Sequence, residues 1–133
     1  MKLPFLELPG DQPLIPRPAV GVELEGAPGL PVLCLVDTGA LGNRLDARVA
    51  AAAGIDLDNP LAEEEIALGG MRTTGRCIRA ELTIAGHRYE APVWFCDPWP
   101  LGFGLLGQEG FLRFFRVTVC AAEGWLDCVP ETR

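Results

Sequence analysis

The stretch that decides the fold is Leu30-Pro-Val-Leu-Cys-Leu-Val-Asp-Thr-Gly-Ala40. Its first seven residues are almost all apolar, which is typical of a strand buried on both faces. Asp37-Thr38-Gly39 follows directly, and Asp and Gly also favour simple turns. A carboxylate delivered by a buried strand costs free energy unless it is hydrogen-bonded or functional. Asp37 is therefore a candidate functional residue.

The sequence on both sides of this stretch indicates a mainly β chain with two short helices. Alternating apolar and polar residues predict a half-buried strand at 20–24. Further strands are expected at 65–68, 77–84, 89–95, 115–120 and 125–129. A helix is expected over 43–53, capped by Asn43 and ended by Gly54, and a second one over 107–115.

The chain has the length of a single domain. It has 133 residues, of which 49% are hydrophobic, enough for a core. No repeat, low-complexity tract or linker divides residues 1–133. Five prolines within residues 1–18 exclude a central strand there and predict an arm or an edge strand.

Charge and composition exclude several classes of function. There are 11 Lys and Arg residues against 18 Asp and Glu, a formal net charge of −7, so nucleic acid and anionic membranes are not expected partners. No apolar run approaches the roughly 20 residues of a membrane span. His87 is the only histidine, so a multi-histidine metal site is excluded and no metal or cofactor is expected.

The cysteine pattern predicts a reduced protein. The chain has five cysteines, an odd number, and no pair has the C-x-x-C spacing of zinc or redox sites. Cys34 and Cys120 lie in apolar runs, where cysteine behaves as a small buried hydrophobe. The N-terminal residues carry prolines and acids where a signal peptide needs a continuous apolar stretch. We therefore expect a cytoplasmic location.

Two glycine-bearing segments follow the Asp37 stretch. The spacing Gly102-x-Gly104-x-x-Gly107 matches the dinucleotide-binding motif. That motif needs a βαβ unit of about 30 residues, and too little sequence follows it in this β-rich chain. A tight backbone crossing is the better interpretation. Residues 68–75, flanked by strand patterns, predict the tip of a hairpin, which is either an inert loop or a flap over a site.

In this order and spacing, these features resemble the retropepsin-like aspartic proteases, the family of the retroviral proteases and their bacterial single-domain relatives. The resemblance runs from about Val20 to Val119. It rests on the apolar strand ending in Asp37-Thr38-Gly39-Ala40, the flap hairpin at about 64–78, and Leu105-Leu106-Gly107 before a short helix. It implies a closed β-barrel or sandwich with a flap hairpin and an active site at a homodimer two-fold.

The resemblance also implies roles for individual residues. Asp37 takes the catalytic place, the Thr38 hydroxyl bonds across the dimer, and Gly39 lets the backbone approach the carboxylates. Ala40 completes this support. The expected flap and substrate contacts are Gly69, Gly70, Met71, Arg72 and Thr73, with a tip at 71–74, and the expected substrate-pocket wall is Leu105, Leu106 and Gly107. In this family the terminal segments usually build the intersubunit sheet.

The predicted function is a homodimeric aspartic endopeptidase that cleaves protein or peptide substrates. Two Asp37 carboxylates, one per subunit, would activate a water without metal, cofactor or histidine. Two alternatives remain. One is a catalytically silent dimerisation or protein-interaction module of the same fold. The other is a Cys–His hydrolase that uses His87.

Overall fold

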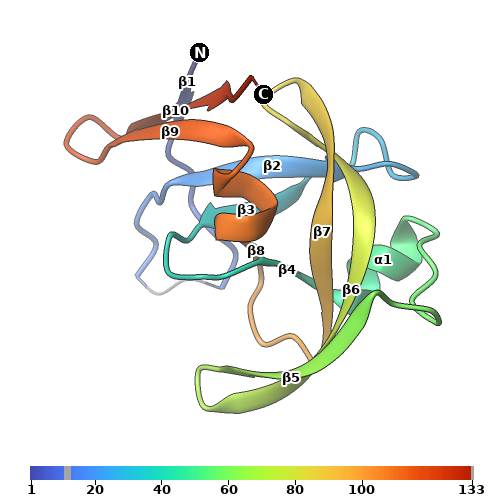
Figure 1. Cartoon of the computed structure of the whole chain (residues 1–133). Helices are drawn as coiled ribbons and strands as arrows, with labels where there is room; N and C mark the ends of the chain where they lie inside the picture. The colour runs from blue at the N-terminus through green and yellow to red at the C-terminus, as the bar shows by residue number, and fades with distance from the viewer. Residues whose placement is uncertain (11–12, 133) are drawn as a thin grey trace.

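The computed structural model describes residues 1–10 and 13–132 and shows a mainly β chain (Figure 1). The strands are β1 (Lys2–Pro4), β2 (Ala19–Leu24), β3 (Val32–Val36), β4 (Asn43–Asp46), β5 (Ala62–Leu68), β6 (Met71–Ile84), β7 (His87–Asp97), β8 (Gly104–Leu106), β9 (Phe115–Cys120) and β10 (Trp125–Pro130). The helical elements are α1 (Ala47–Ala52) and a single π-helical turn, η1 (Gln108–Leu112).

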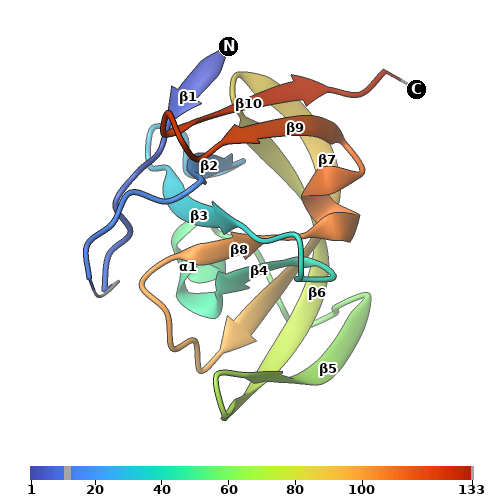
Figure 2. The same cartoon turned by 90° about the vertical axis from the view of Figure 1, so that its left-hand side faces the viewer.

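Six strands close into a barrel. The hydrogen-bonded order is β2-β3-β8-β4-β7-β6, and β6 pairs back onto β2 through Val22↔Ile84 to close it. Figure 2 shows β8 between β3 and β4. β5 extends the sheet beyond β6 as one arm of a hairpin. The expectation of a closed β-barrel with few short helices is confirmed.

The main hydrophobic core fills the barrel and extends to η1, β9 and β10. In β2, β4, β6 and β7, buried positions largely alternate with more exposed ones, as the two-residue period of a strand requires. The largest fully buried apolar side chains in this core are Phe95, Phe111, Phe115, Leu45, Leu82, Ile84, Leu106 and Leu126. A smaller cluster of Ile66, Cys96, Trp99 and Leu105 lies where β5 meets β7 and β8.

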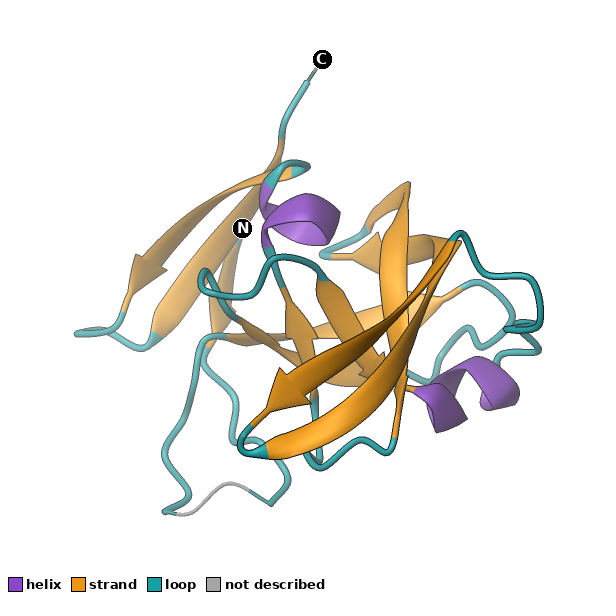
Figure 3. Cartoon of the chain, turned by 60° about the horizontal axis from the view of Figure 1, so that its bottom comes forward, coloured by secondary structure: helices purple, strands orange, loops and turns teal. Residues whose placement is uncertain are grey.

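The chain ends form a separate three-stranded sheet, ordered β1-β10-β9. It stands beside the barrel, next to the C terminus in Figure 3. β1 is an edge strand, which agrees with the arm or edge strand expected from the prolines. Within the single chain, β10 pairs antiparallel with β1 on one side and with β9 on the other.

The expected helix over 43–53 is wrong in its first half. Asn43–Asp46 forms β4, which pairs in parallel with β7 and buries Leu45 in the barrel. The helix begins only after Asp46, whose carboxylate accepts a hydrogen bond from Arg48 N as the N-cap. Gly54, at φ 71°, follows the helix end as expected. Strand pairing therefore determines the structure of Asn43–Asp46, and the helical propensity of the alanines takes effect only from Ala47 onward.

Two further expectations need correction. β3 is central in the sheet, but only Cys34 is fully buried, while its other four residues are half-buried. The second helix is a single turn, Gln108–Leu112, because β9 begins at Phe115. The hairpin expected at 77–95 is confirmed, although β6 begins earlier, at Met71.

Asn43 is buried, with 1% of its surface exposed, and it does not cap a helix. Its Oδ1 accepts a hydrogen bond from Gly107 N at 3.1 Å, and its Nδ2 donates to Gly110 O at 2.9 Å. Tyr89 donates its hydroxyl hydrogen to the same carbonyl at 2.9 Å. The Asn43 amide thus joins β4 to the segment that leads from β8 into η1.

Replacing Asn43 with Ala should destabilise the chain by about 2–3 kcal/mol. The buried Gly107 N–H would lose its hydrogen-bond acceptor, and the Gly110 carbonyl would lose one of its two donors. Urea unfolding followed by tryptophan fluorescence measures the change. Asn59→Ala, at an exposed asparagine, is the matched control and should change stability by less than about 0.5 kcal/mol. Equal losses in the two variants would contradict the bridging role of Asn43.

The five cysteines should differ sharply in reactivity. All are free thiols, and four are buried, while Cys120 is partly exposed. Burial raises the pKa of Cys34 to about 12 and that of Cys96 to about 11. With a disulfide reagent at about pH 8, the native chain should release one equivalent quickly, and Cys120→Ala should abolish this fast phase. Fast reaction of several thiols would show that the core is open.

Candidate active site

Asp37 lies where β3 leaves the barrel. Its backbone N–H donates to Leu106 O at 2.9 Å, one step beyond the parallel pair Val36↔Leu106. The strand that delivers it is central, with β2 on one side and β8 on the other. The position of this residue is therefore set by the barrel and not by a loop alone.

A tight turn orients the Asp37 carboxylate. Its Oδ1 accepts a hydrogen bond from Gly39 N at 2.9 Å, and its carbonyl accepts one from Ala40 N at 3.1 Å. A Cβ at position 39 would lie 3.3 Å from Oδ1, so glycine allows this approach. Within residues 1–10 and 13–132, no hydrogen bond reaches Oδ2 of the half-buried Asp37. That oxygen is available for chemistry.

The loop after Asp37 is bound along its length to the start of η1. Gln108 N donates to Ala40 O at 3.0 Å, and Gln108 Nε2 donates to Thr38 O at 2.8 Å. Glu109 N donates to Leu41 O at 2.8 Å. The carbonyls of Thr38, Ala40 and Leu41 are thus all bound by donors of η1. Sequence reasoning assigned no role to Gln108 or Glu109, because backbone contacts across 70 residues leave no local pattern.

The expected backbone crossing at the glycines is confirmed. A Cβ on Gly107 would lie 2.5 Å from Gly42 O and 2.6 Å from Ala40 O. A Cβ on Gly104 would lie 2.8 Å from Cys34 Sγ. A side chain at position 107 would push the Asp37 loop away from β8, and one at position 104 would displace the neighbouring strands β3 and β4.

The outward side of the loop presents unpaired groups. Thr38 is exposed, and among the described residues its hydroxyl has no hydrogen-bond partner. Leu41 is 64% exposed, a high value for a leucine on a loop held so closely by its backbone. The carbonyls of the loop are thus bound by η1, while the side chains of Thr38 and Leu41 are exposed.

The hairpin expected at about 64–78 is formed by β5 and β6, but its tip differs from the expectation. The two-residue turn is Gly69-Gly70, at φ 57° and 79°, and Leu68 pairs with Met71 across it. Such a turn needs left-handed backbone at both positions, which glycine adopts without strain. Met71 and Arg72 therefore lie on the strand after the tip, and the tip predicted at 71–74 is wrong.

The two faces of this hairpin have different character. Arg72 lies 3.7 Å from Glu65 as an exposed ion pair. Thr73, on the opposite face, is 2% exposed, and its hydroxyl has no hydrogen-bond partner. In Figure 1 the hairpin projects to the left-hand side of the molecule, below the loop that follows β3. It is thus on the same side of the molecule as the loop that follows β3.

The apolar residues before Gly107 divide between the two cores. Leu106 faces the barrel interior, whereas Leu105 packs in the smaller cluster with Ile66 and Trp99. Leu105 therefore packs β8 against Ile66 of the hairpin. Both leucines are buried in the isolated chain.

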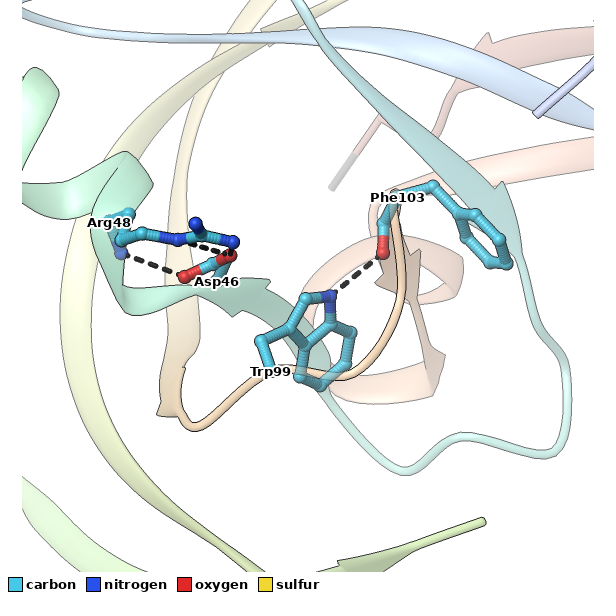
Figure 4. A network of polar contacts seen from close by, with 4 residues as sticks. All are labelled: Asp46, Arg48, Trp99 and Phe103. Carbon is cyan, nitrogen blue, oxygen red and sulfur yellow. Dashed lines mark hydrogen bonds and ion pairs between the residues drawn. The ribbon is translucent and has the colours of Figure 1, made fainter. Parts of the chain in front are cut away.

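Two of the surface cavities lie beside α1. One of about 480 Å³ is lined by residues including Asp46, Arg48 and Trp99. Arg48 binds Asp46, and Trp99 Nε1 donates to Phe103 O at 2.9 Å (Figure 4). Burial alone would raise the pKa of Asp46, but the Arg48 hydrogen bonds outweigh it and the pKa is lowered. These polar groups are paired with one another.

His87 is held among aromatic rings. It stacks on Tyr89 at 6.1 Å between ring centroids and meets the edge of Phe115 at 5.6 Å. No hydrogen bond joins it to a cysteine within the described ranges 1–10 and 13–132. In the same ranges, no group of three or more His, Cys, Asp or Glu side chains could hold a metal ion, and no helix is long and apolar enough to cross a membrane.

The family comparison covers the part of the chain that carries this geometry. No curated protein matches the sequence. The model of the aspartyl protease family matches residues 20–109. This span runs from β2 to the first residues of η1, and it includes the Asp37 loop, the β5–β6 hairpin and β8. The resemblance to retropepsin-like proteases is therefore confirmed, and the chain belongs to the aspartyl protease family.

Proposed function

We propose that the chain is a homodimeric aspartic endopeptidase whose catalytic group is Asp37 from each subunit. The observation that carries this proposal is the fixed Asp37 carboxylate, with Oδ1 bound by Gly39 N and Oδ2 unpartnered within the described chain. Membership of the aspartyl protease family supports peptidase chemistry in general. In this proposal residues 1–133 act as one domain, and the free thiols suit a reducing compartment such as the cytoplasm.

The chemistry requires two copies of the chain. One chain supplies a single Asp-Thr-Gly, whereas the reaction needs two facing carboxylates. A two-fold axis beside the loop would bring the two Asp37 side chains together. The exposed Thr38 hydroxyl would bond to the partner loop, and Leu41 would be covered there. These outward-facing groups gain partners only in a dimer.

The dyad would work with one shared proton. Two carboxylates brought close together cannot both be ionised cheaply, so one is ionised and the other protonated. The ionised Asp37 takes a proton from a water held between them. The resulting hydroxide oxygen bonds to the carbonyl carbon of the peptide, and the protonated partner gives its proton to the developing oxyanion.

Collapse of the tetrahedral intermediate completes hydrolysis. The C–N bond breaks, the amine nitrogen receives the proton that came from water, and the second carboxyl recovers a proton from the intermediate. The products are a carboxylic acid and an amine, and the dyad returns to its starting protonation state. No metal or cofactor takes part in these steps.

The β5–β6 hairpin would close over the bound peptide as a flap. Gly69 and Gly70 give its tip the freedom to move, and Met71 and Arg72 would contact substrate. Thr73, with its unpaired hydroxyl, would offer a hydrogen bond once the hairpin lifts. Beneath it, Leu105, Leu106 and Gly107 would form the wall of the substrate pocket through the β8 backbone.

Asp37→Asn should lower peptide cleavage by about 100-fold or more, because an amide can neither accept the water proton nor carry the dyad proton. Cleavage of a peptide library between about pH 3 and pH 7 measures the effect. Asp58→Asn is the matched control, since it removes an exposed carboxylate from the same chain without touching the loop. It should cleave like the wild type.

Circular dichroism and sedimentation should show that Asp37→Asn still folds and associates. Wild-type activity that survives Asp37→Asn would refute the catalytic assignment. A wild-type dimer that cleaves no peptide at any of these pH values would instead support the catalytically silent dimerisation module. Alkylation of Cys120 should leave cleavage unchanged, and its loss would favour a thiol mechanism.

A further inference from the structure

Arg44 is a cationic side chain without a partner inside the protein. Among the residues that the structure describes, its guanidinium forms no hydrogen bond or ion pair, and its Nε is buried. Arginines on neighbouring strands are matched, as Arg79 of β6 is with Glu90 of β7 at 2.7 Å. A half-buried guanidinium loses hydration that only an acceptor can replace. Arg44 therefore lacks the carboxylate that a cation in this setting needs.

The position of Arg44 in β4 turns its side chain away from the barrel interior. The next residue, Leu45, is 1% exposed and packs in the main hydrophobic core. Successive strand residues point to opposite faces of a sheet, so Arg44 lies on the outer face. Its partners on the adjoining strands are Leu105 of β8 and Trp94 of β7, and both pack with Ile66 of the β5–β6 hairpin in the smaller cluster. Arg44 thus lies on the face against which the hairpin packs.

One row of strand partners connects Arg44 to the strand that delivers Asp37. Leu35 of β3 pairs with Leu105 of β8, and Leu105 pairs with Arg44 of β4, in the strand order visible in Figure 2. Asp37 follows Leu35 by two positions, so the strand period places both on the same face. Neighbouring strands are about 4.8 Å apart, so Arg44 lies about 10 Å across the sheet from β3.

This placement suits contact with a peptide that is bound at Asp37. Asp37 lies about 7 Å along β3 from the row that contains Arg44, since a strand rises about 3.3 Å per residue. An extended peptide advances by the same rise. A side chain two or three residues from the scissile bond would therefore come within reach of the long Arg44 side chain.

Charge and geometry favour a carboxylate as the group that Arg44 binds. A guanidinium presents two parallel N–H donors that match the two oxygens of one carboxylate. The strand partners of Arg44 offer no acceptor, since one is a leucine and the other a tryptophan, whose indole only donates. Cys96 stays a neutral thiol, because burial raises its pKa to about 11. Asp46, the next outward residue of β4, is already bound by Arg48 at 2.6 Å.

We propose that Arg44 is a specificity-determining residue whose guanidinium binds the carboxylate of an Asp or Glu side chain two or three residues from the scissile bond. This inference rests on the proposed function, which brings a peptide to the Asp37 loop. Each subunit of the proposed dimer supplies one Arg44, so the two-fold places one on either side of the scissile bond. The substrate class is then proteins and peptides with an acidic residue near the bond that is cut.

The test compares peptides that differ in a single side chain. Substrates with Glu or Gln at each position around the cleaved bond give the ratio of their kcat/KM values. The wild type should prefer Glu by about tenfold or more at one position, because the carboxylate forms charge-assisted hydrogen bonds that the amide cannot. Arg44→Met should abolish this preference. The net charge of −7 should then make Glu no better than Gln.

Further variants separate the charge of Arg44 from its packing. Arg44→Glu should reverse the preference, so that Lys is favoured over Glu at the same position, which a merely structural role would not produce. Arg79→Met is the matched control, because it removes an exposed arginine of β6 and should keep the Glu preference. Circular dichroism and thermal unfolding should show that each variant folds. Arg44→Met replaces a half-buried cation with an apolar chain of similar length and should not lower Tm.

Failure of this inference can be told apart from failure of the proposed function. A wild type that cleaves peptides without preferring Glu, or a preference that survives Arg44→Met, would overturn the role of Arg44 and leave the peptidase standing. A wild type that cleaves no peptide would remove the peptidase. Fluorescence anisotropy with the same peptides, labelled, then tests the site by binding. Tighter binding of Glu than Gln peptides that Arg44→Met abolishes would support the role of Arg44, and equal binding would overturn it.

Discussion

The buried amide of Asn43 is the contact on which the candidate site depends. It accepts from Gly107 N and donates to Gly110 O, and so joins β4 to the turn that enters η1. From η1, backbone and side-chain donors of Gln108 hold the loop that follows Asp37. Because buried hydrogen bonds stabilise only when every partner is present, loss of this one amide would loosen the whole chain of contacts.

The closed barrel explains why a chain this small can hold a carboxylate in place. Closure through β2 and β6 removes the free edges of the barrel and buries a continuous core. β3 is locked between β2 and β8, so the end of the strand cannot shift without breaking two ladders. The turn at Asp37 therefore inherits the rigidity of the barrel, whereas β5 extends the sheet beyond it.

Local patterns in the sequence located most of the strands, the Asp37 turn and the glycine crossing, because alternation and turn chemistry act between near neighbours. They failed at Asn43–Asp46, where parallel pairing with β7 wins over the helical propensity of the following alanines. They also misplaced the hairpin tip, since pairing of Leu68 with Met71 fixes it at Gly69-Gly70. The roles of Asn43 and Gln108 depend on residues more than 60 positions away, which no local pattern can reveal.

A site divided between two copies makes association part of catalysis. In the proposed dimer, each chain brings one carboxylate and one flap, so a monomer has no competent site. Below the dissociation constant, the concentration of active sites would fall with the square of the chain concentration, by mass action. The net charge of −7 on each chain opposes association. Raising the salt concentration screens this repulsion, so activity per chain would rise with ionic strength.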